Sequence, residues 1–357
     1  MYVHGRKTGC RLSLDYTYRG LRVVFLENES LRVGIITDKG GDIFEFTYKP
    51  HDLDFLWHSP IDLRPPFVAT NSLAEGHFHD YYYGGWQEVL PSAGWASEPY
   101  EGTVQGLHGE LSLLPQSVRV VCDTADEVSI ELSANLYRSP LRIVRRLSLR
   151  RGERRLRIDE RLTNLADREF AIMWGHHPAF GEPFLSDDCH VQTPAGKVTV
   201  MAYHSNGLWH PDEETDYPRA RNRRSGESES VTDVRPKETR SVDVLAFKEL
   251  SDGWYAITNR RMKVGFAMAW DRELFPYLWM WQNYGGHDGY PWYGRAYCCA
   301  LEPFTSFPPV GIAGAVRNGT AKTLEAGETI ETSLVAVAFE GSGARSVTRE
   351  GEVEIES

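Results

Sequence analysis

Four segments of the 357-residue chain place glycines beside polar side chains and aromatic rings. Glycine lets a backbone or a ligand approach closely, so such segments are plausible walls of a small-molecule pocket. In chain order they are residues 84–91, 106–110, 174–181 and 297–305.

Three of these segments hold side chains that can exchange protons near neutral pH: His108, the neighbours His176 and His177, and Glu302. Glu302 ends a strand-like run and is followed by Pro303, so a rigid element would orient its carboxylate. Successive side chains of a strand point to opposite faces, so one of the two adjacent histidines faces a given pocket at most. The pattern favours general acid/base chemistry and not a metal bound by both histidines.

Aromatic residues are numerous, with 10 Trp, 17 Tyr and 15 Phe, and many fall within residues 78–100 and 270–307. Flat apolar rings stack on the C–H faces of sugars, whose hydroxyl groups need fixed hydrogen-bond partners. The substrate-binding residues that we expect are Trp86, Gln87, Trp279 and Gln282, together with Arg64.

Period-two alternation of apolar and polar residues runs through most of the chain, for example over 128–136, 155–162 and 330–339. This alternation predicts an all-β protein built from antiparallel sheets. We expect one domain over residues 1–345, in which the polar tract 211–240 is a loop excursion. Residues 346–357 read as a flexible tail, although Val353 and Ile355 could add a short strand.

The order of three short motifs resembles that of the aldose 1-epimerase (mutarotase) family. They are Leu107-His108-Gly109, His177-Pro178-Ala179-Phe180 and Leu301-Glu302-Pro303. In that family, a Leu-His-Gly-Gly segment and a His-x-Tyr-Phe segment each supply an active-site histidine, and a late Leu-Glu supplies a carboxylate. The resemblance extends roughly from residue 31 to residue 339 and implies a large antiparallel β-supersandwich, in agreement with the strand pattern.

The resemblance implies that His177, Glu302 and His108 are catalytic and that no cofactor or metal is needed. Interconversion of sugar anomers requires removal of the C1 hydroxyl proton and protonation of the ring oxygen, for which one base and one acid suffice. We expect Glu302 to be the base, His177 as imidazolium to be the acid, and His108 to stabilise developing charge.

The chain departs from the family pattern in ways that predict a divergent branch. Ala179 replaces the tyrosine of His-x-Tyr-Phe, and the Gly-Gly-Trp-Gln-Glu run at 84–88 is unlike the galactose enzymes. The early Gly-Arg-x-x-Asn-Arg element is missing, although Arg64 and Asn71 lie in the corresponding region.

Three other interpretations remain open from the sequence. The first is a non-catalytic carbohydrate-binding module on the same fold. The second is a glycoside hydrolase or lyase, in which Glu88, Glu110 or Asp243 would partner Glu302. The third is a metal enzyme that uses His77 and His79, since an HxH pair on a strand shares one face.

Composition excludes several classes of protein. The formal net charge of −11 argues against nucleic-acid binding, and no apolar run reaches the roughly 18 residues of a membrane helix. Five cysteines without a CxxC pair predict reduced thiols and a cytoplasmic location. The expected partner is a small sugar; the sequence does not specify which sugar, whether it is phosphorylated, or the oligomeric state.

Overall fold

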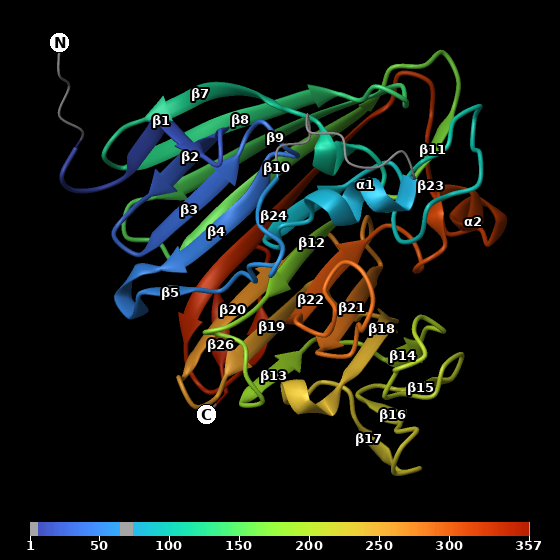
Figure 1. Ribbon diagram of the computed structural model, residues 1–357. Helices are drawn as coiled ribbons and strands as arrows, with labels where there is room; N and C mark the ends of the chain where they lie inside the picture. The colour runs from blue at the N-terminus through green and yellow to red at the C-terminus, as the bar shows by residue number, and fades with distance from the viewer. Residues whose placement is uncertain (1–5, 65–73, 357) are drawn as a thin grey trace.

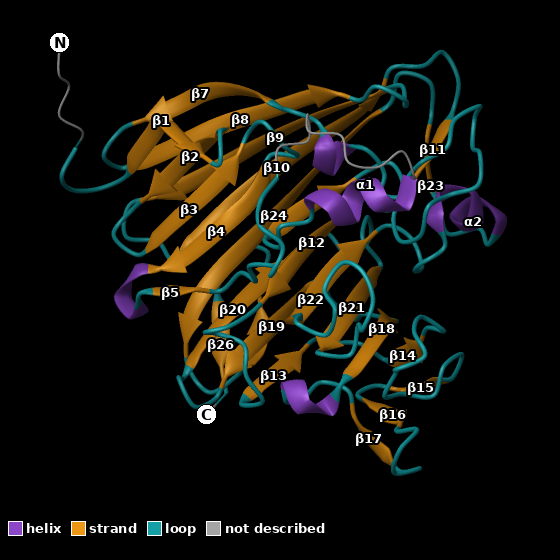
Figure 2. Cartoon of the chain, in the orientation of Figure 1, coloured by secondary structure: helices purple, strands orange, loops and turns teal. Residues whose placement is uncertain are grey.

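The structure is a computed structural model that describes residues 6–64 and 74–356. Two large antiparallel sheets pack face to face, and short helices lie at their edges and over one outer face (Figures 1 and 2). The all-β prediction is therefore confirmed. No helix within the described ranges has the length and apolar character of a membrane span.

The larger sheet has twelve strands. Their spatial order is β1 (Arg11–Tyr18), β2 (Leu21–Glu27), β3 (Leu31–Ile36), β4 (Asp42–Tyr48), β6 (Trp86–Val89), β12 (Gly175–Phe180), β22 (Tyr297–Phe304), β21 (Tyr277–Tyr284), β18 (Ser241–Lys248), β14 (Lys197–Val200) and β15 (Glu214–Asp216), with β5 (Leu53–Asp54) beside β4. The strands at the centre of this order, from β6 to β21, carry three of the four glycine-framed segments.

The smaller sheet has eight strands. Their order is β13 (Cys189–Gln192), β19 (Trp254–Asn259), β20 (Val264–Ala269), β24 (Thr329–Glu340), β10 (Arg155–Asn164), β9 (Leu141–Arg150), β8 (Glu127–Asn135) and β7 (Ser117–Asp123). The other elements are the pairs β11 (Phe170–Ile172) with β23 (Lys322–Leu324) and β16 (Arg219–Arg221) with β17 (Ser228–Ser230), the helices α1 (Ala74–Tyr81) and α2 (Gly311–Arg317), and the 3-10 turns η1 (Lys49–His51), η2 (Leu111–Leu113) and η3 (Lys237–Thr239).

Two segments are more ordered than the sequence predicted. The tract 211–240 contains β15, β16, β17 and η3, and β15 joins the edge of the larger sheet. The expected flexible tail instead forms a hairpin of β25 (Ala344–Val347) and β26 (Val353–Ile355), whose apolar residues pack on β19 and β20. Local composition missed the order of 211–240 and, at the C-terminus, anticipated only the short strand of Val353 and Ile355, because long-range contacts with the sheets order these segments.

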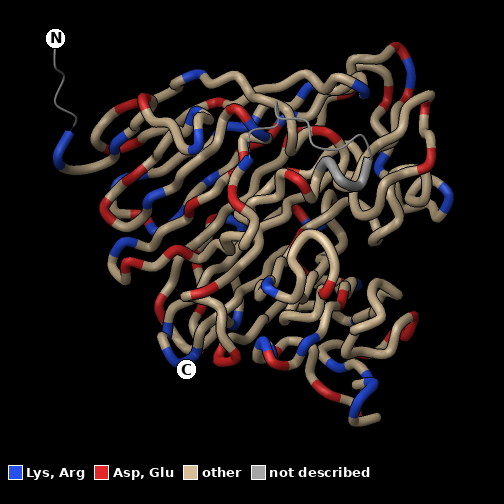
Figure 3. Tube along the Cα trace, viewed as in Figure 1, with Lys and Arg blue, Asp and Glu red and all other residues tan. Residues whose placement is uncertain are grey.

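Charged residues of both signs are interspersed along the strands (Figure 3). The arginine-rich face of the smaller sheet is an example: Arg146 and Arg150 both pair with Glu127, at 3.3 and 3.2 Å. Arg119 pairs with Glu131 at 2.7 Å in the same way. These cross-strand pairs indicate a solvated sheet face.

The main apolar core lies between the two sheets, and it encloses a cluster of four charged or titratable residues. Glu88 and His176 enter from the larger sheet, and Arg145 and Glu160 enter from the smaller one. Arg145 Nε lies 2.8 Å from Glu88 Oε2, and His176 Nε2 lies 3.1 Å from Glu160 Oε2. The cluster therefore joins the two sheets directly behind β12.

Burial disfavours charge in this cluster. It raises the pKa of Glu88 to about 7, with the neighbouring Glu160 adding to the effect, and it raises the pKa of Glu160 to about 8. It also lowers the pKa of His176 to about 4. One cation thus faces two carboxyl groups, and near neutral pH these carboxyl groups retain protons that they would lose in the unfolded chain.

We predict that the free energy of unfolding falls as the pH rises from about 6.5 to about 8. Over this range the unfolded chain has released protons that folded Glu88 and Glu160 keep, while the buried histidines become neutral in the unfolded chain as well, so deprotonation favours unfolding until the folded pKa values are passed. Glu160→Gln removes one of these protons and should flatten the decline, measured as urea midpoints at about pH 6.5 and about pH 8.5. Glu331→Gln, on the exposed face of β24, is the control and should keep the wild-type dependence of the urea midpoint on pH. If Glu160→Gln also keeps that dependence, protons retained by the buried cluster do not cause the decline.

Candidate functional site

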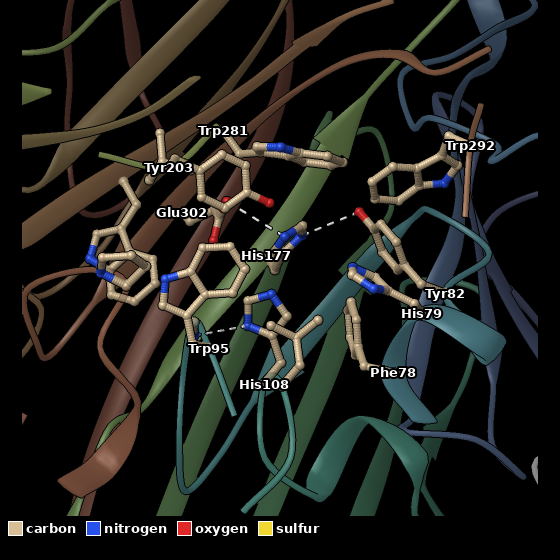
Figure 4. Close-up of a pocket in the computed structure, with 15 residues that line it drawn as sticks. Phe78, His79, Tyr82, Trp95, His108, His177, Tyr203, Trp281, Trp292 and Glu302 are labelled. Carbon is tan, nitrogen blue, oxygen red and sulfur yellow. Dashed lines mark hydrogen bonds and ion pairs between the residues drawn. The ribbon is translucent and has the colours of Figure 1, made fainter. Parts of the chain in front are cut away.

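A pocket opens on the outer face of the larger sheet, away from the core between the sheets (Figure 4). It contains about 530 Å³ of space free of protein atoms, a volume that includes the open solvent at its mouth. The described lining residues are Phe78, His79, Tyr82, Gly94, Trp95, Leu107, His108, His177, Tyr203, Val244, Trp279, Trp281, Trp292, Glu302 and Pro309.

The centre of the pocket is a buried carboxyl–imidazole pair. Strand β12 pairs with β22 through Gly175 opposite Phe304 and Ala179 opposite Ala300, a register that sets His177 opposite Glu302. Nε2 of His177 lies 3.5 Å from Oε1 of Glu302, and both residues are about 3% exposed. Backbone pairing of neighbouring strands therefore holds the two groups together.

Burial controls the protonation of this pair. It raises the pKa of Glu302 well above its usual value and lowers the pKa of His177 to about 4. The proton of the pair consequently rests on Glu302 near neutral pH, next to a neutral imidazole. The sequence assigned the opposite state, a carboxylate with an imidazolium, because unperturbed pKa values ignore loss of solvent.

Tyr82 and His108 complete the polar part of the site. The Tyr82 hydroxyl lies 3.4 Å from Nδ1 of His177, and its pKa is raised by burial, so it keeps its proton. The backbone N–H of Gly94 donates to Nδ1 of His108 at 3.4 Å, while burial holds the pKa of His108 well below its usual value. A neutral His108 whose Nδ1 accepts a hydrogen bond carries its proton on Nε2 and can donate there.

Local backbone geometry places His108 in the pocket. His108 has a φ of +59°, an uncommon left-handed conformation for a residue with a side chain, and Gly109 follows at +70°. A Cβ on Gly109 would lie 2.5 Å from the Leu90 carbonyl oxygen, so this tight turn requires glycine. The histidine–glycine order recognised in the sequence is thus a geometric requirement of the turn.

Aromatic rings form the walls of the pocket. Trp95 stacks on Tyr203 with ring centroids 5.0 Å apart, and Trp95 is 37% exposed, which places this pair at the mouth. Trp279 stacks on Phe304 at 4.0 Å. A Cβ on Gly175 would lie 2.1 Å from the Phe304 ring, so this glycine makes room for the stack.

The structure brings four predicted site residues to the pocket and places four elsewhere. His108, His177, Glu302 and Trp279 line it. Trp86 instead fills the core, where its indole N–H donates to His176. Gln282 is turned away as well, bonded to Trp209 and to the Val231 carbonyl.

Gln87 and Arg64 also lie outside the described lining. Gln87 is paired with His177 across β6 and β12, but its amide donates to the Gly84 carbonyl and to Asp42. Arg64 is exposed, and Asn71 lies outside the described residues.

Strand parity explains two of these corrections, those for Trp86 and Gln282. Trp86 and Gln87 are adjacent, and Trp279 and Gln282 are an odd number of residues apart, so neither pair can share a face of its strand. The same rule correctly separated His176, which contacts Glu160 in the core, from His177 in the pocket. Applied to Trp279, the rule would have identified Trp281, which the sequence reading missed.

Several pocket residues were not predicted individually but lie in the two aromatic-rich segments, 78–100 and 270–307. Phe78, Tyr82, Trp95 and Trp292 lie within these segments and required no signal beyond their clustering. Tyr203 lies outside both aromatic-rich segments and carried no sequence signal.

Three carboxylates considered as partners of Glu302 do not face the pocket. Glu88 belongs to the cluster between the sheets. Glu110 accepts the backbone N–H groups of Tyr137 and Arg138, and Asp243 accepts those of Leu208 and Trp209. Among the described lining residues, Glu302 is the single carboxyl group, which disfavours a two-carboxylate hydrolase.

The HxH interpretation required a strand, but His77 and His79 lie in helix α1. Residues two apart on a helix do not share a face. Within the described part of the chain, the group with metal-like spacing is Glu88, Glu160 and His176, and it already holds the Arg145 guanidinium nearby. This group belongs to the core and not to the pocket.

The fold is that of a galactose mutarotase-like β-sandwich. A candidate aldose 1-epimerase from Klebsiella pneumoniae superimposes with a TM-score of 0.73 at 17% identity, over 93% of this chain and 84% of that one. A galactose mutarotase-like protein from Lactobacillus casei gives 0.57 at 16% identity, over 89% and 100%. One from Clostridium acetobutylicum gives 0.60 at 14% identity, over 93% and 99%.

The chain belongs to the family described as Domain of unknown function (DUF4432), whose model matches residues 18–337. Comparison with curated proteins finds no match. At these identities the solved structures establish the fold, and the resemblance to a divergent mutarotase branch is confirmed at that level.

We predict that substitution of His177 impairs mainly catalysis, whereas substitution of His176 impairs mainly stability. His177→Ala should leave the denaturation midpoint nearly unchanged and abolish most of the activity, because this imidazole lies beside Glu302 in the pocket. His176→Ala should lower the free energy of unfolding by about 1–3 kcal/mol, since it leaves the Trp86 N–H and Glu160 without their partner.

His176→Ala should keep kcat within a few-fold of wild type. Measuring kcat and the urea midpoint for both variants checks the assignment. A folded but inactive His176→Ala variant would contradict it.

Proposed function

We propose that the protein is an aldose 1-epimerase that interconverts the α and β anomers of a small aldose by general acid/base ring opening. The observation that carries the proposal is the buried pair of Glu302 and His177, 3.5 Å apart in an aromatic pocket. The hydroxyl and ring oxygen of a hemiacetal are both attached to C1, so two closely spaced proton-transfer groups suit them.

The protonation states of the site suggest how the protons move. Glu302 as a carboxylic acid protonates the ring oxygen, and neutral His177 takes the proton of the C1 hydroxyl. The C1–O5 bond breaks, leaving an open-chain aldehyde with a carboxylate and an imidazolium. After rotation about C1–C2, closure on the other carbonyl face returns both protons, so each turnover restores the site.

Neighbouring residues support these steps. In the tautomer that this step requires, Nδ1–H of His177 donates to the Tyr82 hydroxyl oxygen, which leaves the Nε2 lone pair on the side of Glu302 free to accept a proton. His108 as a neutral donor can stabilise charge that develops on a sugar oxygen. The aromatic walls exclude water and offer faces for C–H stacking, which suits a pyranose.

The proposal predicts that Glu302→Gln lowers the rate of anomer exchange by at least about a hundredfold. The amide keeps the shape of the side chain and removes the transferable proton. NMR exchange spectroscopy on a panel of aldoses and aldose 6-phosphates measures the rate. Asp243→Asn is the matched control, because Asp243 is also buried but bonds backbone N–H groups outside the pocket; near wild-type exchange in a folded Glu302→Gln protein would remove Glu302 from the mechanism.

A second prediction concerns metal ions. Both proton-transfer steps use side chains of this chain, so exchange should persist after exhaustive treatment with EDTA. Loss of activity that a divalent ion restores would contradict the proposed mechanism.

A further inference from the structure

The buried indole N–H of Trp281 has no hydrogen-bond partner among residues 6–64 and 74–356. The other two buried tryptophans of the pocket differ in this respect. Nε1 of Trp279 donates to the Ser306 carbonyl at 2.8 Å, and Nε1 of Trp292 donates to Ser59 Oγ at 3.2 Å. A buried donor without a partner is destabilising, so its presence in a pocket calls for an explanation.

Strand register places Trp281 beside the reacting pair. It lies two residues after Trp279 on β21, on the same face, and it pairs with Ala300 on β22. Ala300 in turn pairs with Ala179 on β12, and these two small side chains leave space above the sheet that the indole occupies. Ala179 is the position at which the related motif has a tyrosine.

The Trp281 ring is held in one orientation. Its centroid lies 6.0 Å from the His177 ring and 5.2 Å from the Trp292 ring (Figure 4). The ring centroids of Trp57 and Tyr82 lie 6.1 and 6.4 Å from that of Trp281. A donor with a fixed direction discriminates between positions of an acceptor, whereas a mobile donor would follow any of them.

We propose that Trp281 is a specificity-determining residue that donates its indole N–H to one hydroxyl oxygen of the bound aldose, at a ring carbon other than C1. The inference rests on the proposed function for the nature of the ligand. The indole group can donate but not accept, so it requires an oxygen lone pair, which every sugar hydroxyl provides. The substrate is then an aldose that presents a hydroxyl at this one position.

The variant Trp281→Phe removes the N–H while keeping an aromatic ring. With an active parent aldose, KM should rise about 10- to 100-fold and kcat should stay within a few-fold, because the lost bond is remote from C1. Among monodeoxy analogues of that aldose, the one lacking the contacted hydroxyl should bind wild type and Trp281→Phe equally. Trp270→Phe is the matched control and should keep KM within about threefold, since Trp270 lies in the main core outside the pocket lining and its N–H donates to the Phe275 carbonyl.

Unchanged KM in a folded Trp281→Phe protein would overturn the inference. So would an equal loss of affinity for every deoxy analogue, because that result indicates general damage to the pocket.

A second measurement does not depend on that variant or on catalysis. 1,5-Anhydro-D-glucitol and 1,5-anhydro-D-galactitol lack the C1 hydroxyl and cannot change anomer. Saturating ¹⁵N-tryptophan-labelled wild-type protein with whichever binds should move the Trp281 indole N–H signal downfield, while the Trp279 and Trp292 signals keep their shifts. The signals are assigned by elimination with Phe variants of the other pocket tryptophans.

An unmoved Trp281 signal in the saturated protein would overturn the inference. Absence of anomer exchange with every aldose, together with a moved Trp281 signal, would reject the proposed function and leave the binding role of Trp281 standing.

Discussion

The hydrogen bond between His176 on β12 and Glu160 on β10 links the two sheets and favours the register of the strand that carries His177. The adjacent ion pair of Glu88 and Arg145 makes a second link between the same layers. A strand that slips by one residue exchanges its faces, which would drive His177 into the core and His176 into the pocket. The buried cluster makes that slip costly, because each of its polar groups would lose its partner.

Desolvation acts on both faces of β12 but with different consequences. Between the sheets, the Arg145 guanidinium offsets the charge of one carboxyl group, and the cluster serves to hold the layers in register. In the pocket, no cation of the described residues lies beside Glu302 and His177, so burial leaves a proton on the acid and none on the base. The same burial perturbs His176 and Glu160 in the core, and the pocket pair differs from them in that it lines an open cavity.

Similarity to galactose mutarotase-like structures persists at 14–17% identity, because a sandwich needs its alternating pattern and packing more than particular residues. Within this fold, Ala179 and Trp281 lie in one cross-strand row with Ala300, so two small side chains accompany the large indole in the pocket wall.

The sequence by itself determined the antiparallel β class, through alternation such as that of Leu156, Ile158 and Leu162, because which residues one strand buries is a local property. It also determined that His176 and His177 face apart, and motif order pointed to His108, His177 and Glu302. Which strands are neighbours was decided only by the tertiary structure: β6 and β12 are far apart in the chain, yet pairing sets Gln87 beside His177. Burial by segments that are distant in the chain likewise decides the protonation of Glu302, the position of Trp86 in the core and the unpaired N–H of Trp281. Burial of this kind cannot be predicted from the residues near each position in the sequence.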